Sequence, residues 1–398
     1  VETYKIDAVV IAGDVFDTGT PPSYARELYN QLVLKLNQAK CQLLVLGGNH
    51  DAVATLNESK ALLAQLNTQV IANTQASIQD QVIVLKDKSG EAGAIVCAIP
   101  FIRPRDVLKS RAGESALSKK QNLGQAITKH YQGIYELADK KRAQIFEEDE
   151  RWLPIIATGH LTALGVKSSE SVRDIYIGNL EGFDANGFPP ADYIALGHIH
   201  RPQIVAKKEH IRYCGSPIAL SFDELGRAKQ MLLVEFDTPA AQSELTPHIT
   251  ALEIPMFQPI AKLSCDLDSL VDDIAHLCQS CERKPNQEIW LQLEIDTQDY
   301  LSDLQKRVED IVDDYPVKIL QLRRKKGQRT QSFTTNQKET LSELSVQQVF
   351  SKRLSYENFD APNQADRLTR IQAQFDEIYQ AMCDNDRDSS KPHVEGEK

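Results

Sequence analysis

Six residues of this chain share one setting. Each comes within three positions of a glycine that ends a short apolar run, and they are Asp14, Asn49, His50, His160, His198 and His200. Carboxylate, amide oxygen and imidazole groups are ligands that suit Mn²⁺, Fe²⁺ or Zn²⁺. Any one of these histidines alone would be assigned to the core or the surface, but independent placement would not put all of them in the same setting. We therefore interpret the group as a metal site.

The apolar runs before these residues predict buried strands of an α/β sheet. They lie at residues 8–12, 42–46, 154–158 and 193–196. Helical periodicity over residues 22–39 and 57–66 follows the first two runs, and this alternation predicts a parallel sheet. Since the carboxyl ends of parallel strands share one rim, we expect the six residues at that rim. A glycine before each ligand would let the backbone turn sharply there.

The other segments before residue 255 predict a mixed α/β layer sandwich. Residues 81–85 and 94–99 predict a hairpin because turn residues lie between them. Residues 116–148 predict a helix with one strongly charged side, and residues 1–7 predict the end of a helix. Further strands are expected at residues 202–206, 211–214 and 230–236.

A second pattern starts near residue 256. Strand and helix signals alternate over residues 260–322 and predict a small α+β module. We place this module at residues 256–329, after a first domain at residues 1–255. It ends in a basic run that is either a solvated loop or a phosphate contact, and that includes Arg323, Arg324, Lys325 and Lys326.

The C-terminal region predicts a linker and helices over residues 330–383 and a disordered tail at residues 384–398. Apolar residues recur there at three- and four-residue spacing, at Leu368, Ile371, Phe375, Ile378 and Met382. This spacing predicts an amphipathic helix that either packs on its own domain or docks on a partner.

Composition narrows the class of protein. The formal net charge of −11 argues against a globally basic nucleic-acid binder, but not against local, metal-mediated contact with phosphate. No run of eighteen apolar residues and no signal peptide is found, so we expect a cytoplasmic protein without a membrane span. Seven scattered cysteines suit reduced thiols, and the close pair Cys278 and Cys281 lacks the second pair that a zinc site would need.

The histidine pair at residues 198 and 200 points to two ions. In an extended strand their side chains would face opposite ways, but a bend at the strand end could aim them at two neighbouring ions, with Asp14 between them. Two ions clamp a phosphoryl group and its attacking water during in-line displacement. His50 is then left to protonate the leaving oxygen or to stabilise the transition state.

The order and spacing of these motifs resemble those of the calcineurin-like metallophosphoesterases. The short matches are Gly-Asp-x-x-Asp at residues 13–17, Gly-Asn-His-Asp at 48–51, Gly-His at 159–160 and Gly-His-x-His at 197–200. Longer stretches at residues 13–22, 100–104, 173–178 and 213–217 are similar to the SbcD family of bacterial nuclease subunits. The resemblance extends over essentially the whole chain.

This resemblance implies a four-layer α/β/β/α sandwich with a small α+β capping domain and a C-terminal helical tail. It also implies two Mn²⁺ ions, with Mg²⁺ as the alternative. Asp14 would bridge both ions and His200 would serve one of them. The other ion would be completed by Asn49, His160 and His198.

The same resemblance assigns the remaining residues. His50 would be the catalytic histidine, with Asp17 and Asp51 supporting the ligands from behind. DNA would be contacted by the basic run described above and by the loop that carries Arg103 and Arg105. The capping module would steer DNA to the site.

The resemblance further implies an activity and a partner. The family works with the ATPase SbcC, in a suspected heterotetramer, in DNA repair, replication and recombination. The complex acts as an ATP-dependent 3'-5' exonuclease on double-strand DNA and as an endonuclease on single strands and hairpins. The tail after about residue 340 would dock on the SbcC coiled coil.

One departure from the family pattern concerns its first motif, Asp-x-His, which occurs nowhere in the chain. We expect the family's first strand to precede Val1, so that the sequence is an N-terminally incomplete copy. One ion would then keep only Asp14 and His200, and nuclease activity of the chain as written would be weak or absent.

Two other functions stay open on the sequence alone. One is a metallophosphoesterase that acts on small or protein phosphates, since the same ligands serve both chemistries. The other is a non-catalytic protein that binds SbcC and has lost its first motif. The capping-like module and the amphipathic tail favour the nuclease.

Overall fold

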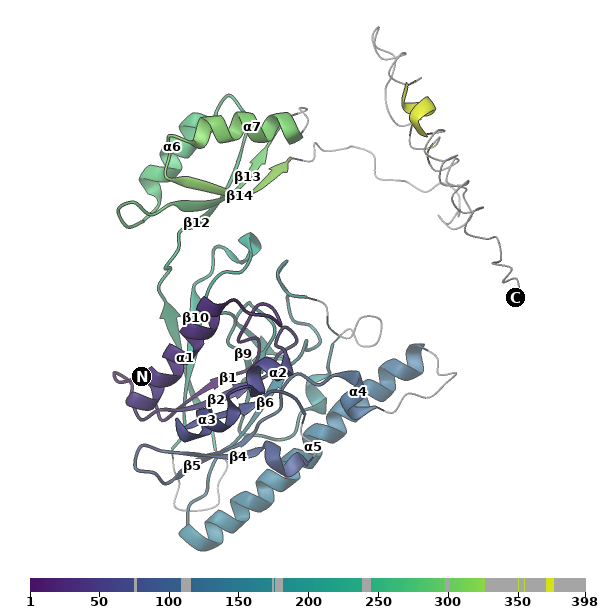
Figure 1. Ribbon diagram of the computed structural model, residues 1–398. Helices are drawn as coiled ribbons and strands as arrows, with labels where there is room; N and C mark the ends of the chain where they lie inside the picture. Colours follow the sequence, from purple (N-terminus) through teal and green to yellow (C-terminus); the bar gives the residue numbers. More distant parts are fainter. Residues whose placement is uncertain are drawn as a thin grey trace, which may run out of the picture. The chain divides into compact units, whose positions relative to one another are not determined.

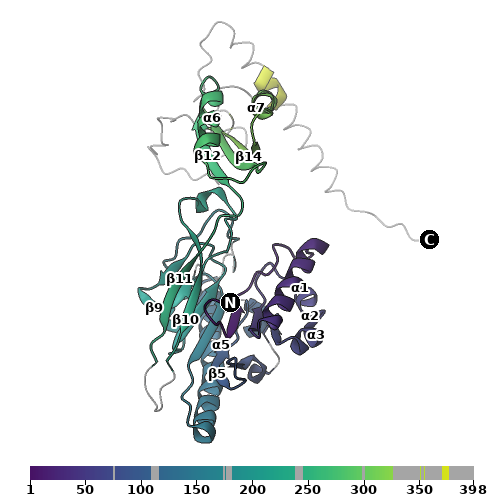
Figure 2. The same ribbon diagram turned by 90° about the vertical axis from the view of Figure 1, so that its left-hand side faces the viewer.

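The computed structural model describes two compact units, Val1–Lys325 and Lys326–Lys398, which we treat separately. In the first unit it describes residues 1–74, 77–108, 116–173, 175, 182–237, 245–297 and 301–325. In the second it describes residues 350, 354 and 370–375. Figures 1 and 2 show the chain in two views.

The N-terminal segment forms a three-stranded parallel sheet in the order β1 (Ala8–Ile11), β2 (Gln42–Leu46) and β3 (Thr68–Ile71). Helix α1 (Ser23–Gln38) connects the first two strands, as predicted. The helix expected at residues 57–66 is confirmed by α3 (Lys60–Gln65), although it begins three residues later. The short helix α2 (Val53–Asn57) before it was not predicted, and the two are separate because the chain leaves helical geometry at Ser59. Strand β3 was not predicted.

The second sheet has six strands in the order β4-β5-β6-β7-β9-β8. They are β4 (Val82–Lys86), β5 (Ala92–Cys97), β6 (Ile155–His160), β7 (Tyr193–Gly197), β8 (Gln203–Val205) and β9 (Lys208–Tyr213). The predicted hairpin is the antiparallel pair β4–β5, and β5, β6, β7 and β9 run parallel. Short helical turns η1 (Ile78–Gln81), η2 (Ala185–Gly187) and η3 (Phe222–Glu224) and helix α4 (Pro104–Val107) lie in the connections.

Strand β2 shows how the layers are built. Successive side chains of a strand face opposite ways. Leu43 and Val45 pack into the core beneath α1–α3, whereas Leu44 and Leu46 pack against Val96 of the second sheet. These four side chains are essentially inaccessible, so residues 43–46 have no solvent face and the two sheets are stacked directly on each other.

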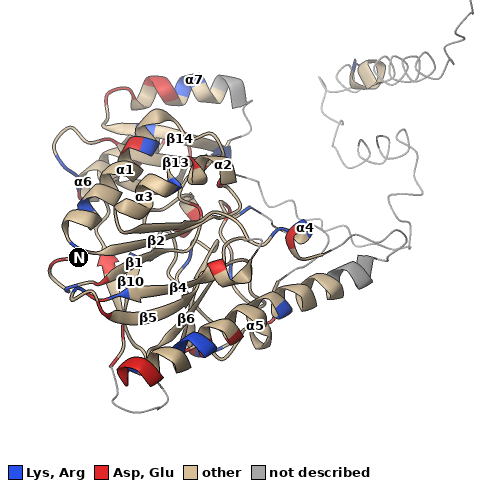
Figure 3. Ribbon diagram, turned by 60° about the horizontal axis from the view of Figure 1, so that its bottom comes forward, with Lys and Arg blue, Asp and Glu red and all other residues tan. Residues whose placement is uncertain are grey.

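Helix α5 (Ala116–Asp149) supplies the fourth layer. Leu123, Ile127, Tyr131 and Ile134 recur at three- and four-residue spacing and are completely buried against the second sheet. Most of its described charged residues are exposed. Figure 3 marks the positions of Lys, Arg, Asp and Glu along the helix ribbon. Figure 2 shows α1, α2 and α3 together on the other side of the molecule. The predicted α/β/β/α sandwich is therefore confirmed.

Two smaller sheets follow along the chain. Strands β10 (Lys229–Glu235) and β11 (His248–Ile254) form an antiparallel pair, of which only the first was predicted. Strands β12 (Ile260–Cys265), β13 (Ile289–Ile295) and β14 (Val317–Arg324) form a parallel sheet. Its crossover helices α6 (Leu270–Ser280) and α7 (Leu301–Val312) share one face of this sheet (Figure 1). These are the elements expected for the small module, whose boundary at residue 256 stays a prediction.

The two ends of the chain are described in part. Lys5 N–H donates to the Glu2 carbonyl, and Ile6 N–H donates to the Val1 carbonyl. This pair of bonds is typical of the C-terminal end of a helix, which is the feature predicted for residues 1–7. In the second unit residues 370–375 are helical, and the rings of Phe350 and Phe375 stack at 3.7 Å. Leu368, Ile378, Met382 and the tail at residues 384–398 lie outside the described residues.

No helix in the described part of the chain is long and apolar enough to cross a membrane.

Candidate metal centre

The six candidate residues come from both stacked sheets. Asp14 follows β1, and Asn49 and His50 follow β2, so the first sheet supplies the carboxylate and the amide. His160 ends β6, and His198 and His200 follow β7 of the second sheet. Since the carboxyl ends of these strands lie at the same rim, segments almost 150 residues apart are brought together.

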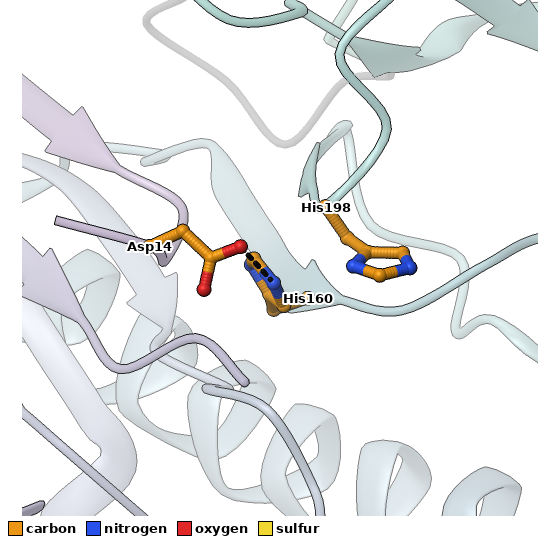
Figure 4. A group of neighbouring side chains, drawn as sticks. All are labelled: Asp14, His160 and His198. Carbon is orange, nitrogen blue, oxygen red and sulfur yellow. Dashed lines mark ion pairs between the residues drawn. The ribbon is translucent and has the colours of Figure 1, made fainter. Parts of the chain in front are cut away.

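Four of the six residues form one cluster. Single ligand atoms of Asp14, His160 and His198 all lie within 4.8 Å of one another (Figure 4). Asn49 Oδ1 lies between the two rings, 2.9 Å from His160 Nε2 and 3.1 Å from His198 Nδ1. The rings of His160 and His198 meet edge to face at a centroid distance of 5.2 Å.

The hydrogen-bond partners of the two histidines indicate that this cluster fits a cation. His160 Nδ1 donates to the Ala12 carbonyl at 2.8 Å, so the neutral ring presents its Nε2 lone pair. That lone pair faces Asp14 Oδ2 at 3.1 Å as well as the Asn49 oxygen. Three such acceptors repel one another unless a proton or a metal ion lies between them. His198 Nε2 is also buried without a hydrogen-bond partner, which adds a further nitrogen in need of a partner.

Electrostatics keep these groups in the ligand form. Burial alone would raise the pKa of Asp14, but the adjacent His160 and the His50 N–H at 3.0 Å lower it to about 2. Burial, followed by the neighbouring His160, lowers the pKa of His198 to about 3. Near neutral pH Asp14 is therefore a carboxylate and His198 a neutral imidazole, as metal ligands must be.

The backbone is strained at two of the ligands. Asp14 has φ 54° and His198 has φ 88°, a region that residues with a Cβ rarely adopt. The expectation that the preceding glycines make the turns holds only for Gly13, which has φ 96°. Gly48 has no positive φ and is required for another reason, because a Cβ there would lie 2.0 Å from Asp14 Oδ1.

Asp51 ties the two loops of the first sheet together. Its carboxylate accepts N–H bonds from Val15 at 3.2 Å, Phe16 at 3.1 Å and Gly48 at 2.8 Å. Burial raises the pKa of Asp51, and these three N–H groups oppose the rise. The residue thus fixes the segment that carries Asp14 to the segment that carries Asn49.

His50 is oriented by the main chain of Asp17. Its Nδ1 donates to the Asp17 carbonyl at 2.7 Å, which commits the proton on that nitrogen. The Asp17 carboxylate is 85% exposed and lies farther from the ring, at 3.5 Å. The expected support from Asp17 is thus delivered by its backbone oxygen rather than by its side chain.

His200 lies outside the cluster of four. Its Nδ1 is 2.7 Å from Ser171 Oγ and 3.2 Å from Glu224 Oε1. Sequence reasoning missed both partners, as well as Lys229, which lies 2.5 Å from Glu224 Oε2. None of these three residues lies in a motif that the sequence analysis singled out.

The basic residues proposed to contact DNA differ in their neighbours and in their exposure. Arg103 lies over the Phe101 ring at 5.7 Å, and Phe101 contacts His160 edge to face at 6.3 Å. The Arg105 side chain is 81% exposed. Arg323 pairs with Glu170 at 3.1 Å. Of the other basic-run residues, Lys325 lies 3.9 Å from Asp296, Arg324 ends β14, and Lys326 is outside the described residues.

Comparison with known proteins assigns the family. The calcineurin-like phosphoesterase family matches residues 1–202. The SbcD component of nuclease SbcCD from Escherichia coli strain K12 is 47% identical over 363 residues, which cover 91% of this chain and 86% of that protein. The chain belongs to the SbcD family of calcineurin-like phosphoesterases. It is therefore a metal-dependent hydrolase of the nuclease class.

Other comparisons are more distant. The family described as type 5 capsule protein repressor C-terminal domain matches residues 256–358. The SbcD proteins of Rhodobacter capsulatus and Bacillus subtilis are 30% and 31% identical, over 67% and 59% of this chain and 66% and 57% of theirs. A crystal structure of a β-glucosidase from Exiguobacterium marinum gives a TM-score of 0.18 at 9% identity, over 81% of this chain and 75% of that one, which is too low to indicate a common fold.

Proposed function

We propose that this protein is the nuclease subunit of an SbcCD-type complex and cleaves phosphodiester bonds of double-strand and hairpin DNA with Mn²⁺ or Mg²⁺. The convergence of Asp14, Asn49, His160 and His198 from two sheets supports this proposal, in a chain whose family consists of nuclease subunits. The proposal would lose its main support if these four side chains did not come together at one site.

The ligand roles follow from the donor set. Asp14, Asn49, His160 and His198 would hold one divalent ion, and Asp14 and His200 would contribute to a second. When bound, such ions neutralise charge on the phosphoryl oxygens and supply hydroxide at neutral pH. Asp51 acts at a distance, since it holds the two loops that present Asp14 and Asn49.

His50 would complete the reaction as a proton donor. As the bond from phosphorus to the leaving oxygen breaks, that oxygen gains negative charge and needs a proton. The Nδ1 proton of His50 is engaged by the Asp17 carbonyl, so the proton to be transferred is the one on Nε2 of the imidazolium. The fixed ring also removes the need for reorientation during the reaction.

DNA contacts would come from arginine and lysine residues around this centre. Arg103 has the strongest case, because it packs on Phe101, which touches His160. Arg105 and the basic run at residues 323–326 would add longer-range attraction to phosphates. We place the DNA-capping role in residues 256–329.

The proposal also includes an ATPase partner. Residues 330–383 would dock on SbcC in a heterotetramer. The separate unit Lys326–Lys398 and its stacked Phe350 and Phe375 support a docking segment with its own apolar contacts.

The decisive experiment compares two substrates. We expect hairpin DNA to be cleaved with Mn²⁺, only weakly by the chain as written because it contains no Asp-x-His motif, and faster with SbcC and ATP. A small phosphodiester such as bis(p-nitrophenyl) phosphate should be cleaved without that stimulation. Asp14→Asn should abolish both activities, and Asp237→Asn, which alters a 92% exposed carboxylate, should change neither. Cleavage of the small diester alone, indifferent to SbcC, would contradict the proposal and favour a small-molecule phosphoesterase.

A further inference from the structure

Glu224 is a buried carboxylate without a place in the ligand set described above. Its side chain is only 1% exposed. Ser169 and Ser171 donate to Oε1 at 2.8 and 2.7 Å, and Lys229 Nζ lies 2.5 Å from Oε2. A carboxylate is removed from water at high free-energy cost unless it is paired and hydrogen-bonded, and this one has several partners at once.

The bonds of Glu224 determine where His200 carries its proton. A carboxylate can only accept, and Ser171 spends its single hydroxyl hydrogen on Glu224. The Ser171 oxygen at 2.7 Å and the Glu224 oxygen at 3.2 Å can therefore only accept from His200 Nδ1. The neutral ring is thus held with its proton on Nδ1 and its lone pair on Nε2.

The same network holds the backbone of His200. The Ser216 N–H and Lys229 Nζ each donate to the His200 carbonyl at 3.1 Å. Lys229 also donates to Ser216 Oγ at 2.8 Å. Glu224 and Lys229 together therefore restrain both ends of the His200 residue.

His200 differs in this respect from the other oriented histidines. His160 and His50 are oriented by the main-chain carbonyls of Ala12 and Asp17. A backbone carbonyl stays in place whatever side chain is present. His200 depends on a carboxylate 24 residues further along the chain.

We propose that Glu224, assisted by Ser171 and Lys229, is the positioning residue that holds His200 with Nε2 available for a divalent ion. A carboxylate behind a ligating histidine fixes its tautomer and raises its basicity, and loss of such a partner typically weakens metal binding by about 10–100-fold. This inference rests on the proposed function only for the identity of the ion.

Two double variants separate positioning from simple stabilisation. Glu224→Gln with Lys229→Met removes the buried ion pair but keeps an oxygen that can accept from His200. Glu224→Leu with Lys229→Met removes the ion pair and the acceptor. Glu209→Gln is the matched control, because it alters a 71% exposed glutamate that pairs only with Arg212 among the described residues.

The readout is the ¹⁵N chemical shift of the His200 imidazole in metal-free protein at pH 8, followed by Mn²⁺ titration. We expect the Gln double variant and Glu209→Gln to keep the Nδ1-protonated tautomer. The Leu double variant should show a tautomer mixture and a Mn²⁺ affinity lower by about 10–100-fold. Unchanged shifts and affinity in the Leu variant would overturn the proposal.

A single variant covers the case in which both double variants unfold. Ser171→Ala leaves Glu224 and Lys229 paired and removes the nearer acceptor, so it should shift the tautomer ratio in the same direction by less. An unchanged ratio in Ser171→Ala would overturn the part of the proposal in which Ser171 assists Glu224. Because the tautomer is measured without metal or DNA, a protein that fails to cleave DNA would contradict the proposed function and leave this inference standing.

Discussion

The two sides of the candidate metal centre are held in place by different means. His160 is oriented by a main-chain group, the Ala12 carbonyl, whereas His200 is oriented by the side chains of Ser171 and Glu224. Main-chain positions are set by the sheets, whereas side-chain hydrogen bonds can be removed one at a time. The orientation of His160 should therefore be lost when the backbone moves, and the orientation of His200 when a single polar side chain is removed.

The largest effect is expected at Asp14, and a comparison with His50 tests the cluster itself. Asp14→Asn should abolish both cleavage and the rise in melting temperature on addition of MnCl₂, because a bound ion stabilises the folded state. His50→Asn should lower cleavage by about 10²–10⁴-fold yet keep that rise, since the His50 ring is outside the cluster and its N–H remains. Loss of the metal-induced rise in His50→Asn would place its ring among the ligands.

The next effect tests the main-chain side. In Gly48→Ala the new Cβ would meet Asp14 Oδ1 at 2.0 Å and its backbone nitrogen at 2.3 Å, so one loop must move. We expect cleavage to fall about 100-fold and the free energy of unfolding by about 2–3 kcal/mol, measured by nuclease assay and urea titration.

Two further alanine variants calibrate that result. In Gly215→Ala, beside His200, the Cβ would lie 2.8 Å from the His200 carbonyl, so a smaller loss is expected. Gly133→Ala in α5 meets only the Ile78 side chain, at 3.4 Å, and should leave stability unchanged or slightly higher. A Gly48→Ala protein that behaves like Gly133→Ala would show that the main chain does not hold the cluster.

A third prediction concerns pH. The pKa of His198 is about 3 in the folded protein and about 6.5 in an unfolded chain. Between these values only the unfolded state binds the extra proton. The free energy of unfolding of metal-free protein should therefore fall as pH drops below 6.5, by about 2 kcal/mol between pH 6.5 and 5 from this group. Above about pH 7.5 His198 should contribute no pH dependence, because the unfolded chain is then deprotonated as well.

Urea titrations of chelator-treated parent and His198→Asn proteins measure this contribution. The variant should show the shallower decline between pH 6.5 and 5. Asp14, with its pKa lowered to about 2, should keep its contribution above pH 4 and lose it only in stronger acid, so it does not disturb the comparison. Parallel curves for the two proteins would mean that His198 is protonated in the folded state.

The smallest effect is expected at the arginines. Arg103→Ala should raise the KM for DNA a few-fold and reduce the salt dependence of binding by about one phosphate contact. Arg105→Ala should change both less, because its side chain extends into solvent. Equal effects of the two variants would argue against a special position of Arg103 beside Phe101.

Much of the site could be predicted from the sequence because its ligands follow strands. An apolar run and a glycine before Asp14, Asn49, His160 and His198 reveal both the strand and its end, and parallel topology then brings the ends together. Burial of the second strand could be predicted for a related reason, since residues 43–46 are all apolar and show no polar alternation. The four-layer arrangement itself was expected from the family resemblance.

What could not be predicted depends on contacts without a sequence period. Glu224 lies in a short turn with no strand before it, and nothing in the spacing to His200 indicates that the two meet. Asp17 was assigned a supporting role without a specified contact, and its backbone oxygen rather than its carboxylate makes the shorter contact with His50. Every residue has such an oxygen, so composition carries no signal for it.

The left-handed backbone at Asp14 and His198 places function and folding in conflict. Glycine would relieve the torsional strain at either position. At Asp14 the relief is opposed by loss of a carboxylate that the fold stabilises, so His198→Gly is the candidate for a more stable metal-free protein, gained by removing a ligand. A consensus or directed-evolution screen that rewards only thermal tolerance would thus tend to erode this centre. Stabilised descendants of this chain should be selected with the ion present, so that ligand loss is penalised in the same step.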